Sequence, residues 1–186
     1  MNYVELHCHS NFSFLDGASH PEDLIERASE LGYSHLALTD HNGLYGIVRF
    51  DQAAKLNNIK AVFGAEITLE TGNHLVLLVK NENGYKNLSK LISITQLENK
   101  KGNARCRKDG LMNHSDGLIA LSGCIDGEIP EAVLNDDLKR AECLVSEYRE
   151  VFGQDNFYLE IQHHNLPVHE FLCGELSKLG KKLKIT

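Results

Sequence analysis

Two histidines near the amino terminus are separated by a single residue, in the sequence His7-Cys8-His9. In an extended backbone alternate side chains point to the same side, so both imidazoles would face one point. Imidazole nitrogens are standard ligands for zinc, manganese and iron. Because an HxH motif is common by chance, its meaning depends on whether other ligands reach the same place.

Further side chains of the ligand type occur where other apolar runs end. In parallel βα folds the chemistry sits at the carboxyl ends of the strands, so these side chains would meet at one edge of a sheet. Several buried charges at one edge need partners, and a metal cluster supplies them. We therefore expect a metal centre built from four such segments in addition to the two histidines: Thr39-Asp40-His41, Gly64-Ala65-Glu66, Ser122-Gly123-Cys124 and Gln162-His163-His164.

The elements that must position these residues are short apolar runs alternating with segments of helical periodicity. This order is typical of a mainly parallel sheet covered by helices. Ser19 and Glu22 have the spacing of a capping box at the start of the first helix. With about seven strands, we predict a distorted, TIM-like βα barrel, and a doubly wound open sheet is the alternative. We expect strands at 3–8, 35–40, 60–69, 74–80, 117–123, 157–162 and 181–186, and helices near 19–31, 46–56, 85–97, 138–152 and 168–179.

Length and composition are those of one globular domain: 186 residues, of which 42% are hydrophobic and 24% charged. The net charge of −7 provides no electrostatic footprint for nucleic acid, and we interpret the basic segment 100–108 as a solvated loop. Five cysteines without a CxxC pair argue against a disulfide framework and a zinc ribbon. The sequence has no apolar run long enough to span a membrane and no visible secretory signal, so we expect a cytoplasmic protein.

The number of candidate ligands favours two or three ions over one. Closely spaced ions suit hydrolysis at phosphorus, because they activate a water and stabilise the attacking and leaving oxygens. The sequence contains no P-loop, GxGxxG or GxSxG motif, so kinase, dehydrogenase and serine hydrolase interpretations have no support.

Several segments resemble the polymerase and histidinol phosphatase (PHP) domain, in order and at the expected spacing, over essentially the whole chain. The resemblance is greatest to the PHP domain that opens the alpha subunit of bacterial C-family DNA polymerases, above all the error-prone form. It implies a (β/α)7-type barrel that holds up to three metal ions. The matching segments are HCHSNFSFLDGASHPEDLIERASELGYSHLALTDHNGLYGIVRF, GAEITL, HLVLLVKN, GYKNLSKLIS and GLIALSGC, and the first is the most specific.

The resemblance also implies the ligands, position by position. Glu66 would bridge two ions, and Asp40 would orient a neighbouring imidazole. Asp40, His41 and Glu66 are the expected catalytic group, with Asp40 or a group next to a ligand handling the proton. The implied ligands are His7, His9, Asp16, His41, Glu66, His74 and Cys124.

The ion type follows from the same comparison. Cys124 stands where stand-alone PHP phosphatases usually place a histidine, and a thiolate there favours a soft ion such as zinc. We expect two or three divalent ions, Zn²⁺ or Mn²⁺ foremost, with Fe²⁺ or Mg²⁺ as alternatives. His163 and His164 fall outside the implied ligand set and are expected at the surface.

In the family the last strand continues into an Asn-Asp-x-His motif with two more ligands, and this chain ends at Ile185-Thr186, short of that motif. We therefore expect residues 1–186 to be a single PHP domain, the N-terminal fragment of a longer DNA polymerase chain. Implied partners are a phosphate ester or a DNA 3′ end as substrate, the remainder of the polymerase chain, and DNA through that chain.

Three functions stay open. In the first, the domain hydrolyses phosphoesters, as a 3′–5′ exonuclease or a pyrophosphatase, and belongs to a polymerase whose site of DNA synthesis lies elsewhere. Alternatively, it is a stand-alone phosphoesterase acting on small phosphate esters, or a structural metal-binding module without catalysis.

Overall fold

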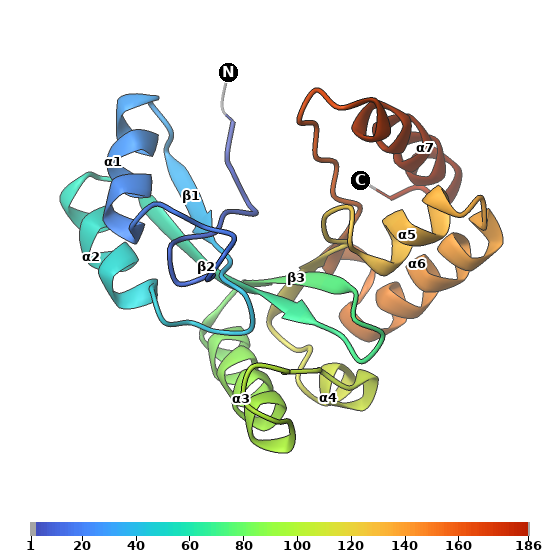
Figure 1. Ribbon diagram of the computed structural model, residues 1–186, viewed down its shortest axis with the longest axis horizontal. Helices are drawn as coiled ribbons and strands as arrows, with labels where there is room; N and C mark the ends of the chain where they lie inside the picture. Colours follow the sequence, from blue (N-terminus) through green and yellow to red (C-terminus); the bar gives the residue numbers. More distant parts are fainter. Residues whose placement is uncertain (1–2, 186) are drawn as a thin grey trace.

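The computed structural model describes residues 3–185, which form a mixed α/β fold (Figure 1). The elements are α1 (Pro21–Glu30), β1 (His35–Leu38), α2 (Ile47–Leu56), β2 (Lys60–Thr68), β3 (His74–Val79), α3 (Glu82–Glu98), α4 (Lys108–Asn113), β4 (Leu118–Leu121), α5 (Glu128–Leu134), α6 (Leu138–Phe152), the short 3₁₀ helix η1 (Gln154–Asn156), β5 (Phe157–Tyr158) and α7 (Pro167–Leu183).

The five strands form one sheet in the order β1-β2-β3-β4-β5. The outer pairs β1–β2 and β4–β5 are parallel, whereas β3 is antiparallel to both β2 and β4. The prediction of a mainly parallel sheet is therefore wrong at its centre. Only residues 69–73 join β2 to β3, and a parallel crossover needs a dozen residues or more, so this short connection forces a hairpin.

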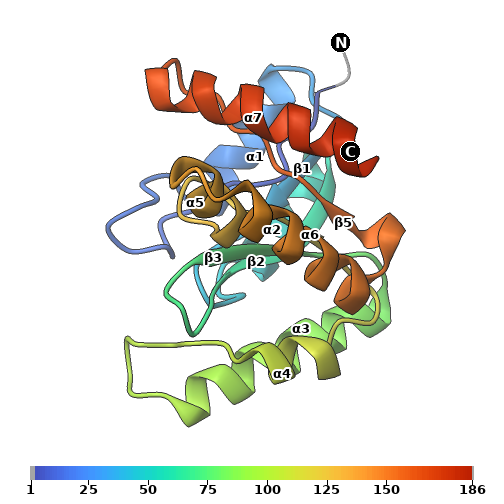
Figure 2. The ribbon, with the colours of Figure 1, turned by 90° about the vertical axis from the view of Figure 1, so that its right-hand side faces the viewer.

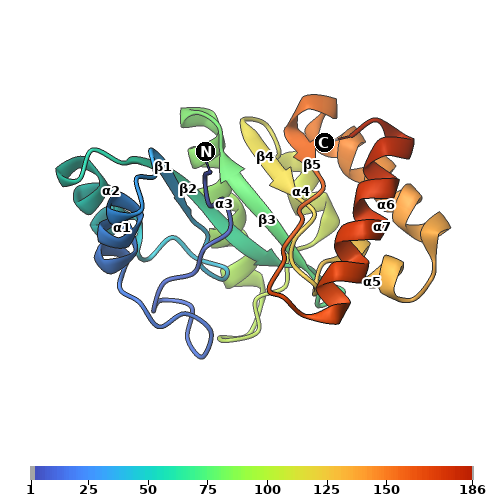
Figure 3. The ribbon, with the colours of Figure 1, turned by 90° about the horizontal axis from the view of Figure 1, so that it is seen from above.

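Helices surround this sheet to give a distorted TIM-like barrel. The pair α1–α2 packs beside β1 and β2, α3 lies against β2, β3 and β4, and α5 to α7 gather at the β4–β5 end (Figures 1 and 3). Seen from the side, α3 and α4 lie on one side of the strands and α7 lies on the other (Figure 2).

The predicted first and last strands differ from the structure. Among residues 3–8, only Glu5 forms a ladder bridge, to Leu36 of β1. Residues 181–183 of the segment predicted as the last strand are the end of α7, Lys184 follows as its C-cap, and Thr186 lies outside the described residues. Leu176, Leu179 and Leu183 keep helical spacing toward the core, and this packing outweighs the alternating pattern of the terminal residues.

Several helix boundaries also differ from the expected ones. The first helix is capped by His20, not Ser19, because Pro21 takes the first helical position and the His20 N–H donates to Asp23 Oδ2 at 3.1 Å. Helix α3 begins at Glu82, and helices α4 and α5 were not expected.

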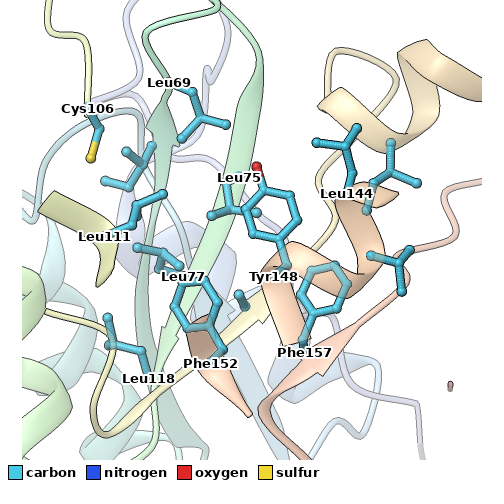
Figure 4. Packing of buried hydrophobic residues seen from close by; sticks show 14 of the residues in the cluster. Leu69, Leu75, Leu77, Cys106, Leu111, Leu118, Leu144, Tyr148, Phe152 and Phe157 are labelled. Carbon is cyan, nitrogen blue, oxygen red and sulfur yellow. The ribbon is translucent and has the colours of Figure 1, made fainter. Parts of the chain in front are cut away.

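The main core packs the sheet against α3, α4, α5, α6 and α7. Leu75 and Leu77 of β3 and Leu144 of α6 belong to this cluster, and Tyr148 stacks on Phe157 with ring centroids 5.3 Å apart (Figure 4). A second cluster packs α1 and α2 against β1. These two cores fix the strands whose ends carry the polar residues. No helix within residues 3–185 combines the length and apolar character needed to cross a bilayer.

Candidate metal centre

Glu66 of β2 lies at the centre of the polar residues and is only 1% exposed. Its backbone is fixed on both sides, because its N–H donates to the Thr39 carbonyl and its carbonyl accepts from the Asn42 N–H. Three imidazoles surround its carboxylate. Oε2 lies 2.8 Å from His7 Nε2, and Oε1 lies 2.8 Å from His41 Nδ1 and 2.9 Å from His74 Nδ1.

The Oε1 atom of Glu66 is buried, yet it has no partner in hydrogen-bonding geometry within residues 3–185. The two imidazole nitrogens beside it are close enough for hydrogen bonds but not aligned for them. A buried carboxylate oxygen without a hydrogen bond is costly. Two ring nitrogens and a carboxylate oxygen that lie this close without hydrogen bonds between them are the arrangement expected around a shared cation. The position of Glu66 Oε1 therefore supports metal binding.

His7 is oriented by a carboxylate on its far side. Its Nδ1 lies 2.6 Å from Glu160 Oε1, and Gln162 Nε2 donates to the same oxygen at 2.7 Å. Because an ionised carboxylate only accepts, the His7 Nδ1 carries the proton, and Nε2 is the atom that faces Glu66. This is the arrangement by which a carboxylate fixes a metal-binding histidine.

His9 is oriented through a serine. Ser13 Oγ has one proton, which it donates to Asp40 Oδ1 at 2.7 Å, so it accepts from the His9 Nδ1–H at 3.1 Å. Nε2 of His9 is then free to bind an ion. It lies 3.2 Å from His7 Nε2. Two nitrogen ligands of one tetrahedral zinc are about 3.3 Å apart, so this spacing fits a common ion.

Asp40 is nearly fully buried and does not contact an imidazole. Its carboxylate accepts hydrogen bonds from the Ser10 N–H at 2.7 Å, the Ser10 hydroxyl at 2.8 Å and the Ser13 hydroxyl at 2.7 Å. The structure therefore places Asp40 beneath the 10–17 loop, where the Ser13 hydroxyl links its carboxylate to the His9 ring. A role in catalysis for Asp40 stays a prediction.

Asp16 lies on the open side of the centre. Its Oδ2 is 3.2 Å from His41 Nε2 and 3.8 Å from His9 Nδ1. The rings of His9 and His41 are stacked with centroids 4.5 Å apart. Asp16 is exposed, so ions at this end of the centre would be reachable from solvent.

His74 and Cys124 complete the group on the other side of Glu66. Cys124 Sγ is 3.8 Å from His74 Nδ1 and 3.9 Å from Glu66 Oε2. The structure thus brings all seven expected ligands together, although their binding of metal stays a prediction. Donor atoms of these seven residues and of Asp126 form four overlapping groups: His7, His9 and Glu66; His9, Asp16 and His41; His41, Glu66 and His74; and His74, Cys124 and Asp126.

The electrostatics of the ion-free centre favour protons where ions would bind. Burial alone would lower the pKa of His7, but hydrogen bonds to Glu160 and Glu66 outweigh it and raise that pKa to about 10. Burial would raise the pKa of Glu66, yet the imidazoles of His41, His7 and His74 beside its carboxylate hold that pKa far below its usual range. Burial, with the Glu66 charge, raises the pKa of the Cys124 thiol to about 12. An ion entering the centre must therefore displace protons from His7 and Cys124.

Sequence reasoning missed two residues that orient the ligands, Ser13 and Glu160, and it placed Gln162 in a segment at the centre without giving it a role. Glu160 and Gln162 follow β5 with alternate spacing, the same signal that identified the first two histidines. His163 and His164 are exposed, as expected.

Comparisons with known proteins agree with the resemblance. The model of the PHP domain family matches residues 5–164. DNA polymerase III subunit alpha of Borreliella burgdorferi is 38% identical over 197 residues, covering 98% of this chain and 17% of the relative. The error-prone DNA polymerase of Symbiobacterium thermophilum is 42% identical over 199 residues, covering 98% of this chain and 18% of the relative. This chain thus spans less than a fifth of the length of these relatives.

A solved structure shares the fold at low sequence identity. A protein from Bifidobacterium adolescentis, provisionally described as a metal-dependent phosphoesterase, superposes with a TM-score of 0.62 at 15% identity, covering 99% of this chain and 85% of that one. Together with the family match over residues 5–164, these findings place the chain in the PHP domain family.

Proposed function

We propose that this chain is the metal-binding PHP domain of a bacterial C-family DNA polymerase and that its centre hydrolyses phosphoesters. The observation that carries the proposal is the buried Glu66 carboxylate surrounded by the ring nitrogens of His7, His41 and His74. A pairing of carboxylate and imidazoles at such distances suits two or three divalent ions, Zn²⁺ or Mn²⁺ foremost.

The residues of the chain have separate roles in this proposal. His7 and His9 hold one ion with Glu66, and Asp16 and His41 hold another on the open side. Divalent ions at such a centre act as Lewis acids toward phosphoryl oxygens. Glu160 and Ser13 face Nδ1 of His7 and His9, which leaves Nε2 of each ring as the atom that would bind an ion, and Asp40 is a positioning residue that acts through Ser13.

The substrate we propose is a phosphodiester at a DNA 3′ end, presented by the remainder of the polymerase chain. The support is the identity of 36–42% to polymerase chains of which this chain covers 17–18%. DNA synthesis in such a protein would belong to residues beyond this domain, since the PHP match accounts for nearly all of the present chain.

Metal content and hydrolysis test the proposal together. The chain is purified without chelator, its metals are counted by elemental mass spectrometry, and its hydrolysis of bis(p-nitrophenyl) phosphate and of a 3′-labelled oligonucleotide is measured. The double variant His9→Ala, Glu66→Gln should lose both the metal and the activity. The matched control, His163→Ala, removes an exposed histidine outside the centre and should retain both.

The outcomes separate the candidate functions. Two or more ions per chain together with loss of the oligonucleotide 3′ end support the proposal. Bound metal without hydrolysis of either substrate would make the domain a structural module. Rapid hydrolysis of small phosphate monoesters, with the oligonucleotide untouched, would favour the stand-alone phosphoesterase.

A further inference from the structure

Asp126 lies beside the two ligands on the β3–β4 side of the centre. It stands two residues after Cys124, in the loop between β4 and α5, and its Oδ2 is 4.0 Å from Cys124 Sγ. One donor atom each from His74, Cys124 and Asp126 lies within 4.8 Å of the other two. Neither the spacing of apolar runs nor the PHP resemblance pointed to Asp126.

The backbone holds Asp126 at this position. Its carbonyl accepts from the His74 N–H at 3.0 Å and from Asn73 Nδ2 at 3.1 Å, which ties the loop to the start of β3. Gly123 allows the approach: it has a φ of +84°, and a Cβ there would lie 2.7 Å from the His74 carbonyl oxygen. The carboxylate is thus carried by a fixed loop on the same strand end as His74.

The two separations from the Cys124 sulfur suit one ion. A tetrahedral zinc separates its sulfur ligand from a nitrogen or oxygen ligand by about 3.6 Å. The observed separations from Cys124 Sγ are 3.8 Å to His74 Nδ1 and 4.0 Å to Asp126 Oδ2, so small side-chain adjustments would close the site.

The group of His74, Cys124 and Asp126 also differs from His7 and His9 in its access to solvent. Asp126 is exposed and lines a cleft of about 760 Å³ together with Asn73, Glu131 and Arg140. Three protein ligands leave the fourth tetrahedral position of an ion open, and here it can face the cleft.

We infer that Asp126 is the third protein ligand of the ion held by His74 and Cys124, which makes an imidazole–thiolate–carboxylate position that opens onto the cleft. The inference rests on the proposed function, because it assumes that the centre binds metal. It adds a ligand that the PHP resemblance did not imply and predicts an accessible ion on the cleft side of Glu66.

Cobalt substitution tests the inference with a spectroscopic signal. Co²⁺ bound to a thiolate gives near-ultraviolet charge-transfer absorption, and its visible bands report ligand type and geometry. The 186-residue chain, stripped with chelator, is titrated with Co²⁺ as wild type, Asp126→Asn and Cys124→Ser. The matched control is Glu131→Gln, which removes a charge from the same cleft without altering the three ligands. Circular dichroism confirms that each variant is folded.

We expect Cys124→Ser to abolish the charge-transfer band, which assigns it to this position. Asp126→Asn should weaken Co²⁺ binding at the band by at least about tenfold and alter the visible bands, while Glu131→Gln leaves both unchanged. If Asp126→Asn binds Co²⁺ with the affinity and the visible bands of the wild type, the inference is overturned while the proposed function stands. Binding of Co²⁺ to the wild-type chain without a charge-transfer band would have the same consequence. Failure of the wild-type chain to bind Co²⁺ at all would overturn the proposed function as well.

Discussion

Two buried carboxylates in the centre have opposite surroundings. Asp40 accepts three hydrogen bonds from Ser10 and Ser13, so its charge is already compensated. Glu66 carries a buried oxygen with no such bond within the described residues, and it faces imidazoles on both sides. The difference supports the proposal that Asp40 holds the loop and that Glu66 binds ions.

The variant Asp40→Asn tests this division. Loss of the charge, and an amide group facing serine donors, should lower the free energy of unfolding by about 2 kcal/mol in the presence of chelator. Zinc affinity should fall about tenfold or more, because Ser13 no longer holds the His9 ring. Urea denaturation and zinc titration measure the two effects.

Asp51→Asn, in the surface pair with Lys55, is the control and should change stability by less than about 0.5 kcal/mol. Unchanged zinc affinity in Asp40→Asn would contradict the positioning role.

Protonation of the centre predicts how the stability of the ion-free chain depends on pH. Folding raises the pKa of His7 from 6.5 to about 10, so its contribution is complete below pH 6.5 and is lost as the pH rises toward 10. Folding lowers the pKa of Glu66 from 4.5, so its contribution is present above pH 4.5 and is lost in acid. Ion-free stability, measured by urea denaturation in chelator, should therefore be highest between pH 4.5 and 6.5. A stability that climbs steadily from pH 6.5 to 10 would contradict the protonated His7.

Metal affinity should have the opposite dependence, because an ion must displace the proton from His7. Zinc affinity should rise with pH, and Glu160→Gln should move this rise down by about one pH unit or more, since the variant removes the charge that stabilises the imidazolium. Zinc titrations over a pH series measure the shift. Glu150→Gln, at an exposed position, is the control. Superimposable curves for Glu160→Gln and wild type would show that Glu160 does not set the protonation of His7.

Residue types at strand ends were enough to predict His7, His9, His41, Glu66 and Cys124 as one group. Asp16 and His74 required the resemblance, because one lies in a loop and the other begins a strand. Glu160 and Ser13 contact the Nδ1 atoms of His7 and His9. Nothing in the spacing of Glu160 and Ser13 along the sequence shows which imidazole each one contacts. Such partners become visible only when the backbone positions are known.

At the scale of elements, the 10–17 loop depends on a close backbone approach. A Cβ at Gly17 would lie 2.0 Å from the Ser10 carbonyl oxygen, so the loop can close only around glycine. Closure holds Asp16 beside His41.

The variant Gly17→Ala should therefore open the loop, lower the free energy of unfolding by about 2 kcal/mol and weaken metal binding at least about tenfold. Denaturation and zinc titration provide the measurements. Gly102→Ala is the control, because that glycine has a φ of +79° but no atom within 4 Å of its Cβ position, so the variant carries backbone strain without a clash. It should leave zinc affinity unchanged. Equal zinc affinities for the two variants would show that loop closure at Gly17 does not position the ligands.

Helices were predicted more accurately than strand pairing. The helix over 138–152 has the expected bounds, since Asp137 caps it and its apolar stripe packs on the core. Strand direction depends on partners that a sequence pattern does not identify, and only the short connection 69–73 indicated a hairpin. The segment 3–8 supplies His7 and leads directly into His9 although it forms a single ladder bridge, so the predicted site did not depend on the predicted strand.

For the whole molecule, the ligands come from segments far apart in the chain: the amino-terminal segment, the ends of β1 and β2, the start of β3 and the loop after β4. Ions bound at Glu66 would join the amino-terminal segment, which has few ladder contacts, to the sheet. Binding to the folded chain alone stabilises it in proportion to the logarithm of ligand concentration.

Zinc or manganese at 100 times its dissociation constant should therefore add about 2.7 kcal/mol, which raises the midpoint of thermal unfolding by roughly 5–10 °C for a chain of this size. Differential scanning calorimetry with added metal and with chelator measures the shift. The double variant His9→Ala, Glu66→Gln should lose it, whereas His163→Ala, whose side chain lies outside the centre, should retain it. An equal shift in the double variant would mean that the metal binds elsewhere, and no shift in any form would mean that these seven side chains hold no ion that the folded chain needs.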